Sequence, residues 1–194
     1  MTAELQRSRP ARPQQGVTVF FTGLSGAGKS TIARALLARL LEMGGRAVTL
    51  LDGDVVRKHL SSELGFSRAH RDLNILRIGF VAAEITKHRG IALCAAIAPY
   101  AAARSEARRM ISEWGGFFEV YVSTPIEVCE ARDRKGMYAK ARAGQIKSFT
   151  GVSDPYEAPD KPELVIDTRQ CTPIEAAATI LDRLRAEGYV DVPE

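Results

Sequence analysis

The chain has 194 residues, of which 45% are hydrophobic and 26% are charged, a composition typical of a soluble globular protein with one domain of ordinary size. No apolar run approaches the roughly 20 residues that cross a bilayer, and the chain does not begin with an apolar segment of the kind that a secretory signal needs. The three cysteines, Cys94, Cys129 and Cys171, are odd in number and far apart. They exclude a complete disulfide framework and a CxxC metal site, and they indicate a reducing, cytoplasmic compartment.

The formal charge of +4 is concentrated in two short stretches. Residues 1–15 contain arginines, prolines and few apolar side chains, so we expect a flexible arm before a single domain at 16–194. Residues 132–147 hold six basic side chains against one acidic side chain, Asp133. A nucleic-acid-binding protein usually has a broad basic face with interleaved aromatic residues. The compact basic segment instead predicts a mobile lid that closes over small anionic ligands, with neither nucleic acid nor membrane as a partner.

From residue 17 onward, apolar strand-like runs alternate with helix-like segments. We expect strands at 17–22, 47–51, 91–97, 117–122 and 164–166. We expect helices at 30–43, 55–60, 71–88, 101–113, 125–134 and 173–187, with residues 135–160 as a loop that contains some helix. This alternation predicts an α/β fold in which helices cover both faces of a parallel sheet.

A phosphate-binding loop directly follows the first predicted strand. The pattern GxxxxGK[ST] is matched by Gly23, Leu24, Ser25, Gly26, Ala27, Gly28, Lys29 and Ser30. Glycines let the backbone N–H groups approach phosphates, and the start of the next helix adds its positive dipole end. We expect Lys29 to contact the β- and γ-phosphates of a nucleoside triphosphate, Ser30 to bind Mg²⁺, and Thr31 to lie near the α-phosphate. The loop predicts a P-loop nucleotide kinase fold but does not identify the phosphoryl acceptor.

Two carboxylates, Asp52 and Asp54, flank Gly53 directly after the second predicted strand. Functional groups gather at the carboxyl ends of strands in a parallel sheet. We therefore expect Asp52 to assist the metal ion and Asp54 to orient or deprotonate the acceptor hydroxyl. The structural alternative is a turn in which Asp54 caps the following helix.

Several further motifs resemble those of adenylyl-sulfate kinases, over residues 16–190. They are the loop just described, Leu51-Asp52-Gly53-Asp54, Gly65-Phe66-Ser67, Asn74-Ile75, Pro99-Tyr100, Glu127-Val128-Cys129-Glu130, Lys140-Ala141-Arg142-Ala143-Gly144, Phe149-Thr150-Gly151 and Asp154-Pro155-Tyr156-Glu157-Ala158-Pro159. The resemblance implies ATP-dependent phosphorylation of the 3′-hydroxyl of adenylyl sulfate (APS), which yields 3′-phosphoadenylyl sulfate (PAPS) in sulfate assimilation. It also implies a homodimer and a possible ATP sulfurylase as partner or fused domain.

The resemblance also implies roles for individual side chains. Arg57, Arg71 and Asn74 would bind the phosphosulfate and ribose of APS, since guanidinium groups pair with tetrahedral oxyanions through two hydrogen bonds. Phe66 and Phe149 would enclose the adenine, with the Ile97 backbone against it, and Lys135 would lie under the lid. Arg132 would contribute to ATP binding. From their residue types alone, Phe66 and Phe149 would be core residues.

The chain departs from the family at Ala98, where many members have a serine that can be phosphorylated. Because Ala98 has no hydroxyl, we expect direct in-line transfer from ATP without a phosphoserine intermediate. The stretch His70-Arg71-Asp72-Leu73-Asn74 also departs, but it keeps the arginine and the asparagine. Two alternatives stay open: a P-loop kinase for another small acceptor, and a catalytically silent domain that senses nucleotides for a sulfurylase. The intact P-loop disfavours the second alternative.

Overall fold

The structure, a computed structural model, describes residues 11–190. Five parallel strands form one sheet in the order β2-β3-β1-β4-β5. The strands are β1 (Val17–Thr22), β2 (Val48–Asp52), β3 (Ile91–Ala95), β4 (Gly116–Val122) and β5 (Leu164–Ile166). The predicted parallel α/β fold is therefore confirmed, and β1 and β5 begin and end at the predicted residues.

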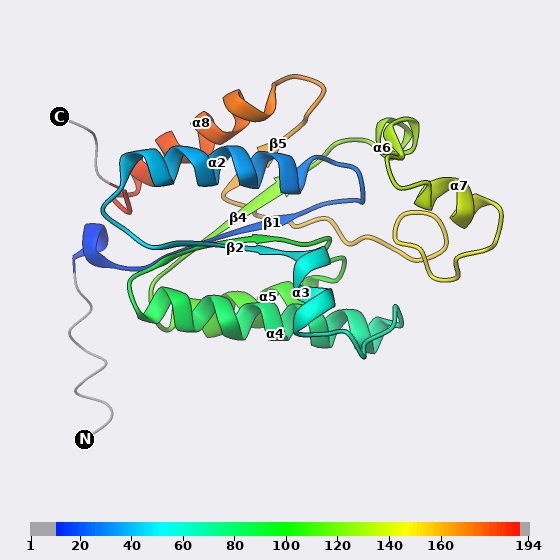
Figure 1. The fold of residues 1–194 in the computed structure, drawn as a ribbon, viewed down its shortest axis with the longest axis horizontal. Helices are drawn as coiled ribbons and strands as arrows, with labels where there is room; N and C mark the ends of the chain where they lie inside the picture. Colours follow the sequence, from blue (N-terminus) through cyan, green and yellow to red (C-terminus); the bar gives the residue numbers. More distant parts are fainter. Residues whose placement is uncertain (1–10, 191–194) are drawn as a thin grey trace.

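Helices cover both faces of this sheet (Figure 1). α2 (Lys29–Met43) and α8 (Pro173–Ala186) pack on one face, and α3 (Gly53–His59), α4 (Arg68–Lys87) and α5 (Ala101–Ser112) lie on the other. α6 (Ile126–Arg132) and α7 (Met137–Arg142) lie beyond the carboxyl ends of the strands, and α7 supplies the helix expected within the lid. A short turn of 3-10 helix, η1, spans Arg12–Gln14.

The central strand β1 shows why the sheet is covered twice. All six of its residues are buried, and successive side chains point to opposite faces. Phe21 joins the core between the sheet and α2 and α8, whereas Phe20 joins the core against α4 and α5. A strand that is apolar on both faces must have a helix layer on each side.

The third strand is shorter than predicted: β3 ends at Ala95 instead of residue 97. Beyond it, the Ile97 carbonyl accepts hydrogen bonds from the backbone N–H of Gly23 and the hydroxyl of Thr22. Ala98 has a positive φ of 46°, which a strand cannot contain. The segment 96–99 therefore leaves the sheet at the edge where the site is located.

The helix that follows β2 begins at Gly53 because Asp52, and not Asp54, is its N-cap. The Asp52 carboxylate accepts a hydrogen bond from the backbone N–H of Asp54 at 3.1 Å. The structural alternative, in which Asp54 caps this helix, is therefore wrong, because the cap is Asp52. Similarly, α4 begins at Arg68 and not at residue 71, because Ser67 caps it.

The first ten residues of the predicted arm lie outside the described residues. Arg12, within the same predicted segment, donates a hydrogen bond to the Glu187 carbonyl at 2.9 Å and forms an ion pair with its carboxylate at 3.1 Å. The end of that segment therefore contacts the end of α8. No helix within residues 11–190 is long and apolar enough to cross a membrane.

Candidate functional site

The phosphate-binding loop connects β1 to α2, as predicted. Gly23 has a φ of +145°, and a Cβ there would lie 2.4 Å from the Val122 carbonyl oxygen, so only glycine fits. Gly28 precedes α2 with a left-handed backbone and has no side chain to cap the helix. The first N–H groups of α2 are therefore available to a phosphate at the positive end of the helix dipole.

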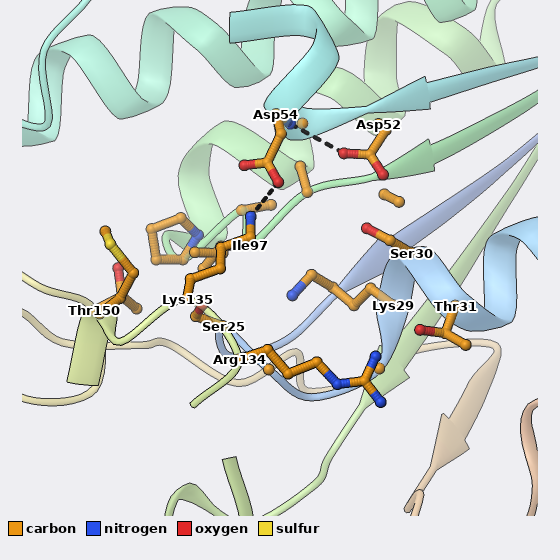
Figure 2. A pocket seen from close by; sticks show the side chains of 18 of the residues that line it. Ser25, Lys29, Ser30, Thr31, Asp52, Asp54, Ile97, Arg134, Lys135 and Thr150 are labelled. Carbon is orange, nitrogen blue, oxygen red and sulfur yellow. Dashed lines mark hydrogen bonds and ion pairs between the residues drawn. The ribbon is translucent and has the colours of Figure 1, made fainter. Parts of the chain in front are cut away.

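Lys29 extends from the first turn of α2 into the cavity beside the loop (Figure 2). Its ammonium group donates hydrogen bonds to the carbonyls of Gly23 at 2.8 Å and Leu24 at 2.7 Å. Burial lowers the pKa of Lys29 to about 8, although the nearby carboxylates of Asp54 and Asp52 act in the opposite direction. The lysine is thus held at the loop, with a charge that can be titrated near neutral pH.

The two carboxylates after β2 have different environments. Asp52 is buried, and its carboxylate lies 3.4 Å from the Arg34 guanidinium in addition to capping α3. Asp54 is exposed and forms an ion pair with Lys135, which comes from the connection between α6 and α7 (Figure 2). This pair joins the predicted lid to the predicted general base.

Protein oxygen atoms suited to a metal ion are few. Within residues 11–190, no three His, Cys, Asp or Glu side chains gather into a metal-binding group. Ser30 and Asp52, however, both line the cavity beside Lys29. Mg²⁺ bound by kinases keeps several waters and takes other ligands from the nucleotide phosphates, so one or two protein oxygens suffice. The donor set fits such an ion.

One cavity of about 600 Å³ brings together residues from the donor and acceptor halves of the predicted site. Its lining includes the predicted residues Ser25, Gly26, Gly28, Lys29, Ser30, Thr31, Asp52, Asp54, Arg57, Phe66, Arg71, Asn74, Ile97, Arg132, Lys135 and Phe149. Gly23, Leu24 and Ala27 belong to the loop but do not line the cavity. The volume is in the range of sites that hold small ligands.

The two predicted adenine-binding rings have unlike surroundings. Phe66 is 55% exposed, with the Arg57 guanidinium 4.7 Å from its ring centre. Phe149 is buried and meets the Tyr138 ring edge-on, with 4.9 Å between ring centres. Phe66 is therefore an accessible apolar surface, whereas Phe149 is fixed by its packing.

Arg71 connects the two aromatic segments. Its guanidinium donates hydrogen bonds to the Phe66 carbonyl at 2.8 Å, to the Thr150 hydroxyl at 2.6 Å and to the Ser148 carbonyl. These contacts bind Arg71 to both protein segments that carry the rings, and its expected role in binding APS stays a prediction. Arg57 donates hydrogen bonds to the carbonyls of Gly65 at 3.1 Å and Leu64 at 3.4 Å, and burial followed by the charge of Arg71 lowers its pKa.

Asn74 is a buried polar residue with an unsatisfied side-chain oxygen. It lines the cavity, is 4% exposed, and this oxygen has no hydrogen-bond partner among the residues that the structure describes. Such buried acceptors are usually satisfied. Asn74 is therefore suited to a ligand that donates a hydrogen bond.

Tyr138 and Thr168 are among the cavity residues that sequence reasoning did not place in the site. The Tyr138 hydroxyl donates to the Ser25 carbonyl at 2.9 Å, which ties α7 to the phosphate loop. The Thr168 hydroxyl lies 3.1 Å from the Ala27 carbonyl and accepts from Arg132 at 2.8 Å. Thr168 follows β5, so the rule that functional groups gather after parallel strands would have indicated it.

A phosphate loop after β1, an acid pair after β2 and a shared cavity at the carboxyl edge of a parallel sheet define a P-loop kinase. The chain belongs to the adenylylsulphate kinase family, whose sequence model matches residues 15–167.

Proteins with assigned names agree with this family. An adenylyl-sulfate kinase from Halothermothrix orenii is 52% identical over 183 residues, which cover 94% of this chain and 97% of that protein. A sulfate adenylyltransferase from Phaeosphaeria nodorum is 53% identical over 186 residues, which cover 96% of this chain but 32% of that protein. The chain thus spans about a third of the length of the sulfate adenylyltransferases it matches.

A solved structure matches over most of its length. The APS kinase of Mycobacterium tuberculosis, in complex with AMPPNP and APS, has a TM-score of 0.85 and 43% sequence identity. The match covers 89% of this chain and 99% of that one. At this identity the likeness extends beyond the fold shared by P-loop proteins.

Proposed function

We propose that this chain transfers the γ-phosphoryl group of ATP to the 3′-hydroxyl of APS and produces PAPS and ADP. The observation that carries the proposal is the single cavity in which Lys29 and Ser30 of the phosphate loop lie opposite the carboxylates of Asp52 and Asp54 and the predicted APS-binding side chains. Membership of the adenylylsulphate kinase family supports the choice of acceptor.

The donor side would bind ATP through loop backbone groups and Lys29. The phosphates would replace the Gly23 and Leu24 carbonyls as partners of the Lys29 ammonium group. Arg132, which lines the cavity next to Thr168, would contact the nucleotide. Ser30 and Asp52 would hold Mg²⁺, directly or through water, and the ion would neutralise charge on the phosphates.

The acceptor side would bind APS between Phe66 and Phe149, with the Ile97 backbone next to the adenine. Base stacking on aromatic rings contributes about 1–3 kcal/mol per base. Arg57 and Asn74 would bind the polar parts of APS, since Arg57 carries a charge at the cavity and the Asn74 oxygen is unsatisfied. Arg71 would contribute its charge and hold the two ring segments, and Lys135 would lie over the acceptor beside Asp54.

The transfer would be direct. The 3′-oxygen of APS forms a bond to the γ-phosphorus while the bond from that phosphorus to the bridging oxygen breaks, and Asp54 accepts the hydroxyl proton. Ala98 lines the cavity and has no nucleophilic group. With γ-labelled ATP and no APS, the denatured protein should carry no label above background, and a stoichiometric labelled protein would contradict direct transfer.

We further propose a cytoplasmic enzyme that acts as a homodimer or with an ATP sulfurylase. The match to one third of sulfate adenylyltransferases supports the second arrangement, since those chains carry a region similar to this one. Cys94, Cys129 and Cys171 form no disulfide with one another, which is consistent with a reducing compartment.

A coupled assay of ADP release tests the proposed reaction. ADP release should require APS, and Lys29→Ala should abolish it because the charge at the β- and γ-phosphates is lost. A panel of other small acceptors, such as nucleoside monophosphates and sugar acids, serves as the control for specificity. Lack of APS-dependent ADP release, or faster release with another acceptor, would overturn the proposal.

A further inference from the structure

The segment 96–99 lies between the two halves of the cavity. It follows β3, leaves the sheet and lines the cavity with Ile97 and Ala98 (Figure 2 labels Ile97). Ala98 is 1% exposed and has a φ of 46°, a conformation that is disfavoured for residues with a Cβ. Something outside the segment must therefore hold it in place.

Thr22 provides one such contact from the phosphate-loop side. It is the last residue of β1, it directly precedes Gly23, and its side chain is fully buried. Its hydroxyl donates to the Ile97 carbonyl at 2.7 Å and lies 3.2 Å from the Ala98 carbonyl. The backbone N–H of Gly23 donates to the same Ile97 carbonyl at 3.3 Å. The Ile97 carbonyl oxygen, on the acceptor side of the cavity, is thus bound directly by Gly23, the first residue of the phosphate loop, and by its neighbour Thr22.

The direction of the hydrogen bonds around Thr22 follows from the number of protons. A threonine hydroxyl has one proton, and the carbonyls of Ile97 and Ala98 only accept. The Thr22 proton therefore points at these carbonyls, and the Tyr156 hydroxyl, 2.8 Å away, donates to Thr22. Hydrogen bonds in such a chain strengthen one another.

Tyr156 lies in the segment Asp154-Pro155-Tyr156-Glu157, which we call the strap. The backbone N–H of Glu157 donates to the Pro99 carbonyl at 2.8 Å. The buried Arg104 donates to the carbonyls of Ala98 and Glu157, each at 2.7 Å. The segment 96–99 is therefore held from three sides: by β1, by α5 and by this strap.

We propose that Thr22 is a positioning residue for phosphoryl transfer, which acts through the Ile97 carbonyl to fix the phosphate loop relative to the acceptor side of the cavity. The proposal rests on the proposed function, in which the Ile97 backbone lies against the adenine of APS. Because in-line transfer depends on the relative placement of donor and acceptor, a small shift of this segment slows the reaction more than it weakens ATP binding.

The test compares Thr22→Val with Thr18→Val in the full chain. Both threonines lie on β1, both are fully buried, and each hydroxyl contacts a second hydroxyl, since Thr18 lies 2.8 Å from the Thr86 hydroxyl. Thr18, however, is at the opposite end of the strand from the cavity. Thr22→Val should lower kcat/KM for APS about 10- to 100-fold, while KM for ATP changes less than about twofold.

Thr18→Val should lower the thermal midpoint of unfolding without a change in kcat/KM for APS or in KM for ATP. Thr22→Ser, which keeps the hydroxyl, should restore kcat/KM for APS to within a few-fold of the original chain. Tyr156→Phe removes the hydroxyl that donates to Thr22 but leaves the hydrogen bond from Thr22 to Ile97. It should therefore lower kcat/KM for APS less than Thr22→Val does, and it replaces Thr22→Val as the test variant if that protein folds poorly. Equal effects of Thr18→Val and Thr22→Val on kcat/KM would reduce Thr22 to a stabilising residue and overturn the proposal.

Amide hydrogen exchange separates this proposal from the proposed function, because it needs no APS. In Thr22→Val, the peptide that covers residues 95–101 should exchange faster than in the original chain, and in Thr18→Val it should not. Unchanged exchange would overturn the positioning role even if the enzyme phosphorylates APS. If Thr22→Val shows the faster exchange but the original chain does not phosphorylate APS, the proposed reaction is excluded and the anchoring role of Thr22 is kept.

Discussion

The titration of Lys29 gives a quantitative prediction about ATP binding. Burial lowers its pKa from 10.5 to about 8, and only the protonated ammonium group attracts the phosphates. A group with a pKa of about 8 is about nine-tenths protonated at pH 7 and about one-tenth protonated at pH 9. The value of kcat/KM for ATP should therefore fall about tenfold from pH 7 to pH 9.

The assay is the pH profile of kcat/KM for ATP, which reports the ionisations of the free enzyme. The sign follows from the charge: the rate constant is high when Lys29 is protonated and is lost as the pH rises through about 8. A lysine with the ordinary pKa of 10.5 would leave the profile flat to pH 9.

Lys135 is the other lysine that lines the cavity, so the control is Lys135→Arg, whose guanidinium does not titrate in this range. The fall near pH 8 should persist in this variant. A profile that stays flat to pH 9.5, or a fall that disappears in Lys135→Arg, would refute the assignment to Lys29.

Three further substitutions test other parts of the site. Asp54→Asn should lower kcat about 10²- to 10⁴-fold with little change in KM for APS. Unchanged turnover would exclude Asp54 from the mechanism. The control is Glu63→Gln, which alters an exposed acidic residue near α3 and should leave kcat unchanged. Phe66→Ala should raise KM for APS about 5- to 150-fold through lost stacking, whereas Phe80→Ala, 61% exposed on α4, should leave it unchanged; equal KM values would exclude stacking at Phe66. Arg104→Met should lower the free energy of unfolding by about 3–5 kcal/mol and the thermal midpoint by about 6–20 °C, measured by urea and thermal denaturation. The substitution removes the 3.1 Å partner of the buried Glu119 carboxylate, which keeps only Arg108 at 3.3 Å, and it removes the donor to the Ala98 and Glu157 carbonyls. A loss below about 1 kcal/mol would contradict this account.

Features of the fold that depend on neighbouring residues were predicted well. The first strand is a run of β-branched and aromatic residues that ends at a glycine loop, so its bounds, Val17–Thr22, follow from the sequence. The phosphate loop is also local, since a single motif sets both its backbone and its chemistry.

Features that depend on distant partners were predicted poorly. The apolar residues Ala96 and Ile97 predict a continuation of β3. In the structure, however, the strand ends at Ala95, and the Ile97 carbonyl accepts a hydrogen bond from the hydroxyl of Thr22, 75 residues away. The start of α7 is likewise not visible in the sequence pattern, because the Asp133 carboxylate accepts from the backbone N–H groups of Tyr138 and Ala139 across a glycine turn. Neither contact leaves a periodic pattern in the sequence.

The candidate site was also predicted only in part, because some of its contacts join residues that are far apart in the chain. Asp52 and Asp54 were placed at the cavity correctly, but their spacing does not show which of them caps α3. The contacts of Arg71 with Ser148 and Thr150 join segments that are far apart in the chain. Only the resemblance to a family brought Phe66 and Phe149 together in advance, and their roles in binding APS stay predictions.

The basic segment 132–147 shows how net charge divides between structure and site. Arg142 forms an ion pair with Glu130, so its charge is neutralised on the surface of the protein. Arg132, Arg134 and Lys135 line the cavity instead, and Figure 2 shows Arg134 and Lys135 extending toward it from the connection after α6. Lys135 is itself paired with Asp54. Because charges at a concave site attract polyanions more effectively than charges spread over a surface, we expect the positive potential offered to the proposed ligands, ATP and APS, to depend on cavity side chains such as Arg132, Arg134 and Lys29 more than on the charge of the whole segment.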